Sequence, residues 1–406
     1  MYKKVLIIGG NLFNKGAQAM TFISVSELRK REPGAKIVLL STKDYLKNEE
    51  EKKKYNFEIL PFTFRDLLYE LGGFYWLFSS LIGLKKKRND DESIRYRIHK
   101  AIRNADIMID ISGFALSSQW GIVGCITYLY MIKLMSKKRI KTMLMPQSFG
   151  PFDFKGIKKF FVDYNAKRYL KYPTIIFARE KEGYEILKNR YKLKNVHLSP
   201  DLVLQSSGLD ERFLFKPGTH FQKLPQIKDK SVAILPNIRV FANCDTAELI
   251  SKYDVIISYL LEMGKNVYLI WHSTEDYKVC IQIKENFKTI EKVILMTQEL
   301  SCLEYERIVA SFDYIVASRY HSIVHAYKQG IPCIAIGWAV KYYELLNLFN
   351  QSKYVIDIRK GLNTEMFCKL LDDMEEKYPL YNRCIEDKVK EIKKENCFKF
   401  LDELSG

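Results

Sequence analysis

Short, mainly apolar runs recur along this chain, and a polar turn and a helical pattern follow almost every one. The runs lie at 5–8, 36–41, 105–111, 142–145, 174–177, 231–235, 266–271, 292–296, 314–317, 332–337 and 354–358. Apolar runs of this length, bounded by turn residues, are typical of parallel strands that are buried on both faces. Their alternation with helical patterns restricts the chain to α/β folds built around parallel sheets.

The alternating pattern occurs in both halves of the chain, and a change of composition separates them. Residues 206–230 are rich in Gly, Pro, Lys and Asp and show little periodicity, which is typical of a linker. We predict an α/β fold of two Rossmann-like domains facing a cleft, an arrangement called GT-B-like. The N-terminal domain is expected at 1–205, the C-terminal domain at 231–377 and a long charged helix at 378–406.

The amino-acid composition limits the classes of binding partner and the cellular compartment that we expect for this protein. The net charge of +17, from 65 Lys and Arg against 48 Asp and Glu, favours anionic partners, although lysines on solvated helix faces account for much of it. We expect no nucleic-acid partner, because no recognition motif is present. The eight cysteines are dispersed without zinc spacing, and the chain begins directly with a strand pattern, so we expect reduced thiols in a cytoplasmic protein.

The most informative polar cluster follows the apolar run at 314–317 and reads Ser-Arg-Tyr-His-Ser over 318–322. In open α/β sheets ligands bind where strands end and helices begin. Arg319 offers a planar fork for phosphate or carboxylate, and His321 offers a proton that moves near neutral pH. The alternative is that Arg319 pairs with a structural carboxylate and His321 caps a helix. His325 lies one helical turn after His321, but no third ligand is evident, so no metal is expected.

Other strand ends carry polar residues that belong to the same predicted sheet edges. They are Asn14, Ser112 and Gln147 in the first half, and Asn237, Arg239 and His272 in the second. Each has a structural alternative. The loop at 9–17 could serve close helix–strand packing, Arg239 an inter-domain salt bridge, and His272 a hydrogen-bonded loop.

Several of these motifs together resemble the polysaccharide pyruvyl transferase family. The matching stretches are Ser-Arg-x-His at 318–321 with Gly-Ile-Pro at 330–332, Asn-Lys-Gly-Ala at 14–17, Pro-Gln-x-x-Gly-Pro-Phe at 146–152, Ala-Arg-Glu at 178–180, Pro-Asp at 200–201 and Asn-x-Arg at 237–239. The resemblance covers about 5 to 343. The chain departs from many relatives at Ser112-Gly113, where they have Gly-Gly followed soon by an acidic residue.

The resemblance implies a transferase that moves pyruvate from phosphoenolpyruvate, as a ketal, onto a sugar of a cell-surface polysaccharide such as a capsule or exopolysaccharide, or onto its precursor. Phosphoenolpyruvate would be a co-substrate, and neither a cofactor nor a metal is required. Arg319 and Arg239 would hold its phosphate and carboxylate, and His321 would protonate the enol carbon or act on the leaving phosphate. Arg319 and His321 are thus the expected catalytic residues. The expected substrate-binding residues are Arg239, Asn237, Ser318, Ser322 and His272 on the donor side, and Asn14, Gln147 and Ser112 on the acceptor side.

Two other functions remain open at this point. A GT-B glycosyltransferase with a nucleotide-sugar donor would share the fold and the helix N-terminus. A non-catalytic polysaccharide-assembly protein would need the glycan surface but not the Arg and His cluster.

One further segment bears on membranes. Residues 67–84 are nearly all apolar, with Glu70 as the only acid, and Lys85-Lys86-Lys87-Arg88 follows. Glu70 and Gly72-Gly73 argue against a membrane span, whereas an interfacial helix with a basic flank fits an anionic lipid surface. The alternative is a buried helical excursion. The first interpretation predicts peripheral association with the inner face of the cell membrane and a glycan or lipid-linked oligosaccharide acceptor.

Overall fold

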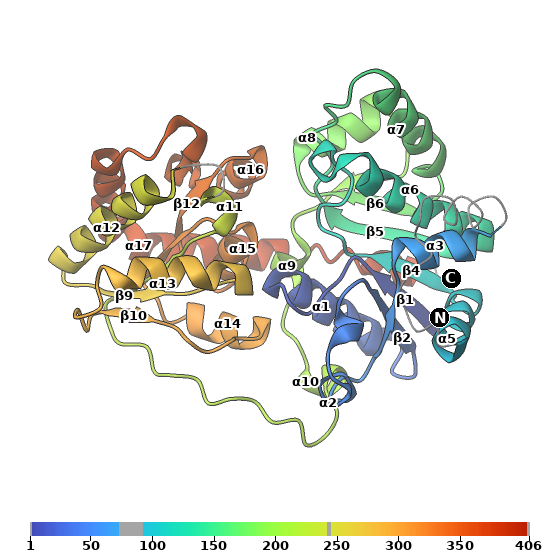
Figure 1. The fold of residues 1–406 in the computed structure, drawn as a ribbon, viewed down its shortest axis with the longest axis horizontal. Coiled ribbons are helices and arrows are strands. Elements are labelled where there is room, and N and C mark those ends of the chain that lie inside the picture. Colours follow the sequence, from blue (N-terminus) through green and yellow to red (C-terminus); the bar gives the residue numbers. More distant parts are fainter. Residues whose placement is uncertain (1, 73–91, 242–244, 404–406) are drawn as a thin grey trace.

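The computed structural model describes residues 2–72, 92–241 and 245–403 of the 406-residue chain. Two parallel sheets dominate the structure, one from each half of the chain, and helices cover both (Figure 1). The predicted α/β class with two Rossmann-like units is therefore confirmed.

The sheet of the N-terminal half has the strand order β3-β2-β1-β4-β5-β6-β7. Its strands are β1 (Lys4–Ile8), β2 (Lys36–Ser41), β3 (Glu58–Pro61), β4 (Ile107–Asp110), β5 (Lys141–Gln147), β6 (Ile175–Ala178) and β7 (Val196–Leu198). Its helices are α1 (Lys15–Arg31), α2 (Glu49–Lys53), α3 (Phe64–Leu71), α5 (Glu92–Arg103), α6 (Gly121–Lys138), α7 (Gly156–Tyr169), α8 (Lys181–Glu185) and α9 (Leu202–Gln205). The order reverses between β1 and β4, so a crevice for ligands is expected at their carboxyl ends.

The sheet of the C-terminal half repeats this topology as β10-β9-β8-β11-β12-β13. Its strands are β8 (Ser231–Leu235), β9 (Asn266–Leu269), β10 (Val293–Leu295), β11 (Tyr314–Ala317), β12 (Cys333–Gly337) and β13 (Val355–Asp357). Its helices are α11 (Ile238–Phe241), α12 (Thr246–Glu262), α13 (Tyr277–Glu285), α14 (Cys302–Val309), α15 (Tyr320–Lys328), α16 (Val340–Leu348) and α17 (Thr364–Ile392). Here the order reverses between β8 and β11, the strand that precedes Arg319 and His321.

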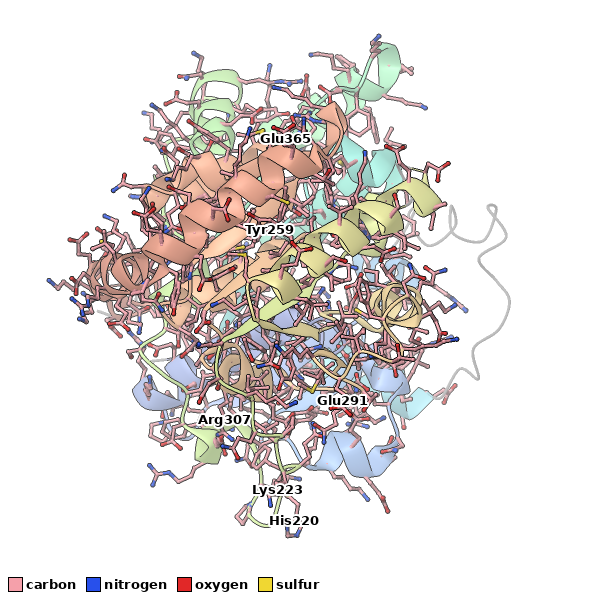
Figure 2. The ribbon with its side chains drawn as sticks, turned by 90° about the vertical axis from the view of Figure 1, so that its left-hand side faces the viewer. His220, Lys223, Tyr259, Glu291, Arg307 and Glu365 are labelled. Carbon is pink, nitrogen blue, oxygen red and sulfur yellow. The ribbon has the colours of Figure 1, made fainter. Side chains whose placement is uncertain are left out.

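The connection at 206–230 is extended except for the short helix α10 (Glu211–Leu214). It loops beneath both sheets, and Figure 2 shows His220 and Lys223 at its lower end. Arg307 on α14 forms an ion pair of 2.5 Å with Glu211, which ties this connection to the C-terminal half.

The C-terminal helix differs from its expected start at 378. Helix α17 begins at Thr364 and continues through Pro379 to Ile392. A proline inside a helix removes one hydrogen bond, but burial of an apolar face outweighs that loss here. Its buried residues include Phe367, Leu371, Met374, Ile385, Val389 and Ile392.

After α17 the chain returns to the N-terminal half as α18 (Lys399–Glu403). The Phe400 ring stands 5.4 Å from that of Phe177, and Arg31 donates to Asp402 at 3.0 Å. The final helix therefore belongs to the opposite half from α17.

Residues 67–72 of the predicted interfacial segment lie within the described part of the chain. Leu67 and Leu71 on α3 are buried, and Glu70 bonds to His99 at 3.1 Å. These residues match the alternative of a buried helix, while 73–88 lies outside the described residues. Within the described ranges no helix is long and apolar enough to cross a membrane.

Candidate active site

The loops at the carboxyl ends of β8 and β11 are bound to each other through Asn237. Its side-chain Nδ2 donates to the Ser318 carbonyl at 3.0 Å, and its Oδ1 accepts from the Arg239 backbone N–H at 3.0 Å. Asn237 and Ser318 are both buried, and Tyr342 also donates to the Ser318 carbonyl. These contacts favour a framework role over the predicted direct contact with substrate.

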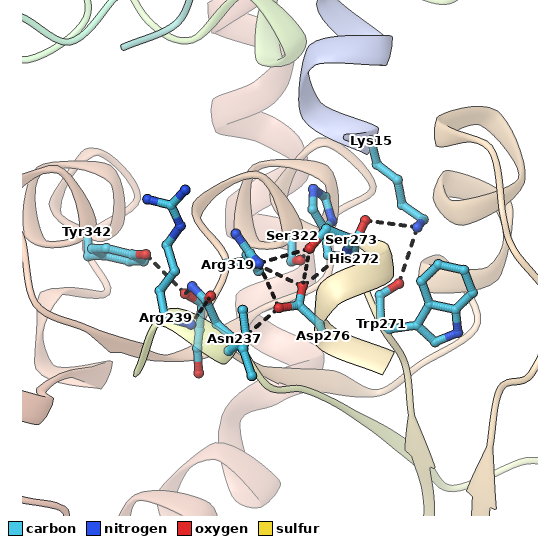
Figure 3. A network of polar contacts seen from close by, with 12 residues as sticks. Lys15, Asn237, Arg239, Trp271, His272, Ser273, Asp276, Arg319, Ser322 and Tyr342 are labelled. Carbon is cyan, nitrogen blue, oxygen red and sulfur yellow. Dashed lines mark hydrogen bonds and ion pairs between the residues drawn. The ribbon is translucent and has the colours of Figure 1, made fainter. Parts of the chain in front are cut away.

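Arg319 points its guanidinium at Asp276, as Figure 3 shows. Its Nε and Nη2 donate to the two carboxylate oxygens at 2.9 and 2.6 Å, and Nη2 also donates to the Ser273 hydroxyl. Asp276 is fully buried and accepts a further bond from the Ile238 backbone N–H. Most of the Arg319 fork is thus occupied by a structural carboxylate, which was the alternative interpretation of this residue. Its Nη1 makes none of these bonds with the described residues.

His321, at the start of α15, lies against the first turn of α1 from the other half. A β-carbon added to Gly16 would stand 2.1 Å from the Cγ of His321, so the ring occupies space that only a glycine leaves open. The imidazole Nε2 is 3.8 Å from an Asp201 oxygen and makes no hydrogen bond with the described residues. The Asn14-Lys15-Gly16-Ala17 motif therefore serves the contact between the halves.

Two neighbours complete that contact. Asn14 caps α1, because its Oδ1 accepts from the backbone N–H groups of Gly16 and Ala17 at 3.0 and 3.2 Å. Lys15 crosses to the C-terminal half and donates to the carbonyls of Trp271 and His272 at 3.2 and 2.9 Å (Figure 3). Burial lowers the pKa of Lys15 to about 8. The structure thus shows Asn14 as the cap of α1, and its predicted contact with an acceptor stays a prediction.

The electrostatic surroundings keep the His321 imidazole neutral. Burial is the largest cause and lowers the pKa to about 3; Asp201 opposes the shift, and the Arg179 guanidinium adds to it. At neutral pH the ring therefore carries a lone pair and one proton. A role as general acid requires something that raises this pKa.

The Ala-Arg-Glu and Pro-Asp motifs meet behind His321. The buried Arg179 guanidinium donates to Glu180 at 2.8 Å, to Asp201 at 2.7 Å and to the Ser148 hydroxyl at 2.5 Å. Its carbon also lies 4.2 Å from the Tyr320 ring centroid. Residues that follow β5, β6 and β7 thereby support α15 across the interface between the halves.

Lys341, near the start of α16, was not among the predicted site residues. Its Nζ lies 5.0 Å from the Phe114 ring centroid and 5.4 Å from that of Tyr320. No carboxylate in the described parts of the chain forms a hydrogen bond or ion pair with it. Burial lowers the pKa of Lys341 to about 8, with Arg179, Arg239 and Arg319 adding to the shift and Glu180 opposing it. The rule that polar residues follow buried strands could have found it, because β12 ends only four residues earlier.

Arg239 stands at the entrance to this cationic region. Its side chain is exposed, and the guanidinium carbon lies 5.5 Å from the ring centroid of Trp120 in the other half. Arg239 also lines a cavity of about 540 Å³ together with Gln119, Asp245, Glu248 and Trp338. The cavity is thus formed by both halves and offers carboxylates and an indole face.

The remaining predicted residues lie deeper in the structure. His272 is buried and its Nδ1 is 3.0 Å from the Ser322 hydroxyl, while burial lowers its pKa well below the usual value. Ser112 donates to Asp110 at 2.5 Å, and Gln147 donates to the other oxygen of Asp110 at 3.2 Å. His272 and Ser322 support α15, and Ser112 and Gln147 support the ends of β4 and β5.

The structure therefore brings His321, Arg319, Arg239 and Lys341 to one region between the sheets. No group of three or more His, Cys, Asp or Glu residues within the described ranges could hold a metal ion.

Comparisons with known proteins agree with this architecture. UDP-GlcNAc 2-epimerase from Methanocaldococcus jannaschii has 13% identity and a TM-score of 0.51, covering 91% of this chain and 92% of that chain. The Neisseria meningitidis UDP-GlcNAc 2-epimerase bound to UDP-GlcNAc has 12% identity and a TM-score of 0.52, covering 96% and 98%. HepE from Anabaena in complex with UDP has 9% identity and a TM-score of 0.54, covering 99% of both chains. Such low identities show a shared GT-B-like fold alone.

Sequence comparison is more specific about the family. No curated protein matches the chain. The model of the family described as polysaccharide pyruvyl transferase matches residues 14–339. This range contains Asn14, Gly16, Arg239, Arg319 and His321 and ends just before Lys341. Since the match covers more than half of the sequence, the chain belongs to the polysaccharide pyruvyl transferase family and is a transferase.

Proposed function

We propose that this transferase moves pyruvate from phosphoenolpyruvate onto a sugar of a cell-surface polysaccharide or of its precursor, forming a ketal. The observation that carries the proposal is Lys341. It is a half-buried cation whose described neighbours include Arg239 and Arg319 but provide no ion-pair partner. Repulsion from the neighbouring arginines helps to lower the pKa of Lys341, so binding of an anionic ligand beside Lys341 relieves that repulsion.

The donor carries two anionic groups, a phosphate and a carboxylate. Lys341 and Arg239 are the proposed principal ligands for them, with Nη1 of Arg319 available beside them. Arg179 is already saturated by Glu180, Asp201 and Ser148, so we assign it to positioning rather than to direct binding. The sequence predicted Arg319 and Arg239 as the donor ligands, whereas this proposal makes Lys341 a principal ligand in place of Arg319.

The reaction needs one proton on the enol CH₂ carbon of phosphoenolpyruvate. It also needs a group that accepts the protons lost by the two sugar hydroxyls. The enol carbon becomes a methyl group, two sugar oxygens bond to the adjacent carbon, and phosphate leaves with the second proton. His321 is the proposed acid–base group, but its imidazole is neutral in the unliganded protein. Placing the donor's negative charges beside it favours the imidazolium form, as Asp201 already does to a smaller extent.

The cavity next to Arg239 is the proposed acceptor site. Carboxylates such as Asp245 and Glu248 accept hydrogen bonds from sugar hydroxyls, and Trp338 offers an apolar face against which a sugar ring can pack. The cavity adjoins the donor site through Arg239, so a hydroxyl of the bound sugar can approach the donor.

The test is incubation of the purified protein with phosphoenolpyruvate and extracted lipid-linked precursor, followed by mass spectrometry and a phosphate-release assay. We expect pyruvate on the glycan in equal amount to released phosphate. Parallel incubations replace phosphoenolpyruvate with a panel of nucleotide sugars. Sugar transfer from one of these, without pyruvate transfer, would contradict the proposal and favour a glycosyltransferase.

A further inference from the structure

Helix α7 presents apolar side chains to solvent rather than to the core. Ile157, Phe160, Phe161 and Tyr164 are 83%, 71%, 41% and 52% exposed, respectively. Their spacing of i, i+3, i+4 and i+7 places them along one face of the helix. The opposite face contains the buried Val162, Asn165 and Ala166 and packs beside α6. The exposed stripe is therefore a second apolar face on a helix whose first face is already buried.

Cations surround this stripe. Residues 155–171 contain Lys155, Lys158, Lys159, Lys167, Arg168 and Lys171. Asp163 is the only acidic residue in that segment, and it is bonded to Lys159 and Arg190 at 2.7 Å. The face thus combines an apolar centre with a strongly positive margin.

We propose that α7 is a docking surface for an anionic lipid bilayer. Exposed aromatic and aliphatic side chains insert at the boundary between headgroups and acyl chains, and flanking lysines are attracted to anionic headgroups. A second copy of this chain fits the surface less well, because a two-fold contact would place like charges against each other. This surface is separate from the predicted 67–88 segment.

The position of α7 gives the docking a direction. The helix follows β5, whose carboxyl end leads into Ser148, and Ser148 donates to Glu180 beside the candidate active site at 2.9 Å. The first turn of α7, with Ile157, therefore starts from the same sheet edge as the site. Figure 1 shows α7 on the outer side of the N-terminal half beside α6. A membrane held there could present a lipid-linked acceptor to the site, a consequence that rests on the proposed function, whereas the docking does not.

The test is sedimentation of the full chain with vesicles of phosphatidylglycerol and phosphatidylcholine, compared with vesicles of phosphatidylcholine alone. We expect binding to the anionic vesicles that weakens as salt rises. Ile157→Ser with Phe160→Ser should reduce the partition coefficient at least about tenfold, because two inserted apolar side chains are lost. Lys158→Gln with Lys159→Gln should reduce it on anionic vesicles only.

The matched control is Met366→Ser with Leu380→Ser, which removes two exposed apolar side chains from α17 and should leave binding unchanged. Circular dichroism melting checks that each variant is folded. Unchanged binding of the Ile157/Phe160 variant, or equal binding to both vesicle types, would overturn the proposal. So would a light-scattering mass showing that this variant only dissociates an oligomer. None of these measurements requires phosphoenolpyruvate, so loss of the proposed reaction would not affect them.

Discussion

His321 and Gly16 come from different halves of the chain, yet the imidazole ring fills the space that a β-carbon on Gly16 would occupy. Such a β-carbon would stand 2.1 Å from Cγ and 2.4 Å from Nδ1 of the ring. The position of the candidate acid–base group therefore depends on a residue more than three hundred positions away.

Gly16→Ala should displace His321 and lower turnover by about tenfold to a hundredfold, because small misplacements of a reacting group are costly. Steady-state kinetics on the folded variant measures the effect. Gly34→Ala is the matched control, since its β-carbon would meet only a Glu32 side-chain oxygen at 3.7 Å. Equal kinetics in the two variants would show that the contact does not position His321.

Lys341→Met should weaken phosphoenolpyruvate binding about tenfold or more, since hydrogen bonds to charged groups contribute about 1.5–3 kcal/mol. Isothermal titration calorimetry gives the dissociation constant. The control is Lys353→Met, which removes an exposed lysine paired with Asp373 and should not alter donor affinity. A donor affinity that is the same in both variants would remove Lys341 from the site.

Donor binding should also weaken as pH rises through about 8. The pKa of Lys341 is lowered to about 8 in the unliganded protein, so above that value binding must be accompanied by proton uptake. Arg179, which adds to the lowering of this lysine's pKa, keeps its own charge across that range because its pKa is raised above the usual arginine value. Calorimetric titrations from about one pH unit below the Lys341 pKa to about one unit above it measure the donor affinity. Repeating them in buffers of different ionisation enthalpy measures the proton uptake. The Lys341→Met variant should lack this pH dependence.

His321→Asn should reduce turnover by about a hundredfold or more if the imidazole is the acid–base group.

The effect of His321→Asn on stability follows from the lowered pKa of His321. The folded protein holds the pKa of His321 at about 3, below the unfolded value near 6.5, so the unfolded chain binds more protons between those values. The stability present above about pH 6.5 is lost as pH falls toward 3, and His321→Asn should lose less of it. Urea unfolding at several acidic pH values, compared with the unmodified chain, measures the difference. Identical slopes would mean that His321 does not titrate as described.

Arg319→Gln should destabilise the fold by about 3–5 kcal/mol, because it leaves the buried Asp276 carboxylate without its ion-pair partner. Adding Asp276→Asn should recover part of that loss, since the uncompensated charge is removed. Urea unfolding of the single and double variants measures both effects. A stable single variant that only loses donor affinity would return Arg319 to the role of a principal donor ligand.

The apolar runs predicted eleven of the thirteen strands that the structure describes, because strands buried on two faces have few alternatives. The edge strands β3 and β7 were not among those runs, since both are short and β7 buries only Val196. The strand-end rule also predicted that Arg319, His321 and Arg239 gather at one sheet edge, and the structure has them in one region between the sheets. The rule could not predict the ion pair between Asp276 and Arg319, because that pair depends on how two loops from distant strands meet. Lys341 obeys the same rule, yet it follows the last matching motif and carries no pattern of its own.

Two other features show where periodicity misleads. The C-terminal helix was predicted to begin at 378, but α17 begins at Thr364, and buried residues on both sides of Pro379 keep it continuous. In α7, a helical spacing of Ile157, Phe160, Phe161 and Tyr164 would ordinarily indicate a core-facing stripe. In the structure Val162, Asn165 and Ala166 face the protein instead, so the stripe is exposed.

The return of the chain through α18 means that the two halves are joined by two covalent crossings, one at 206–230 and one after α17. A single tether would allow one half to swivel freely against the other. Two separated connections restrict the relative motion of the halves to a hinge motion about the line that joins the connections. Bending about that line would widen and narrow the cavity beside Arg239, and each closure would return Gly16 and His321 to the same alignment.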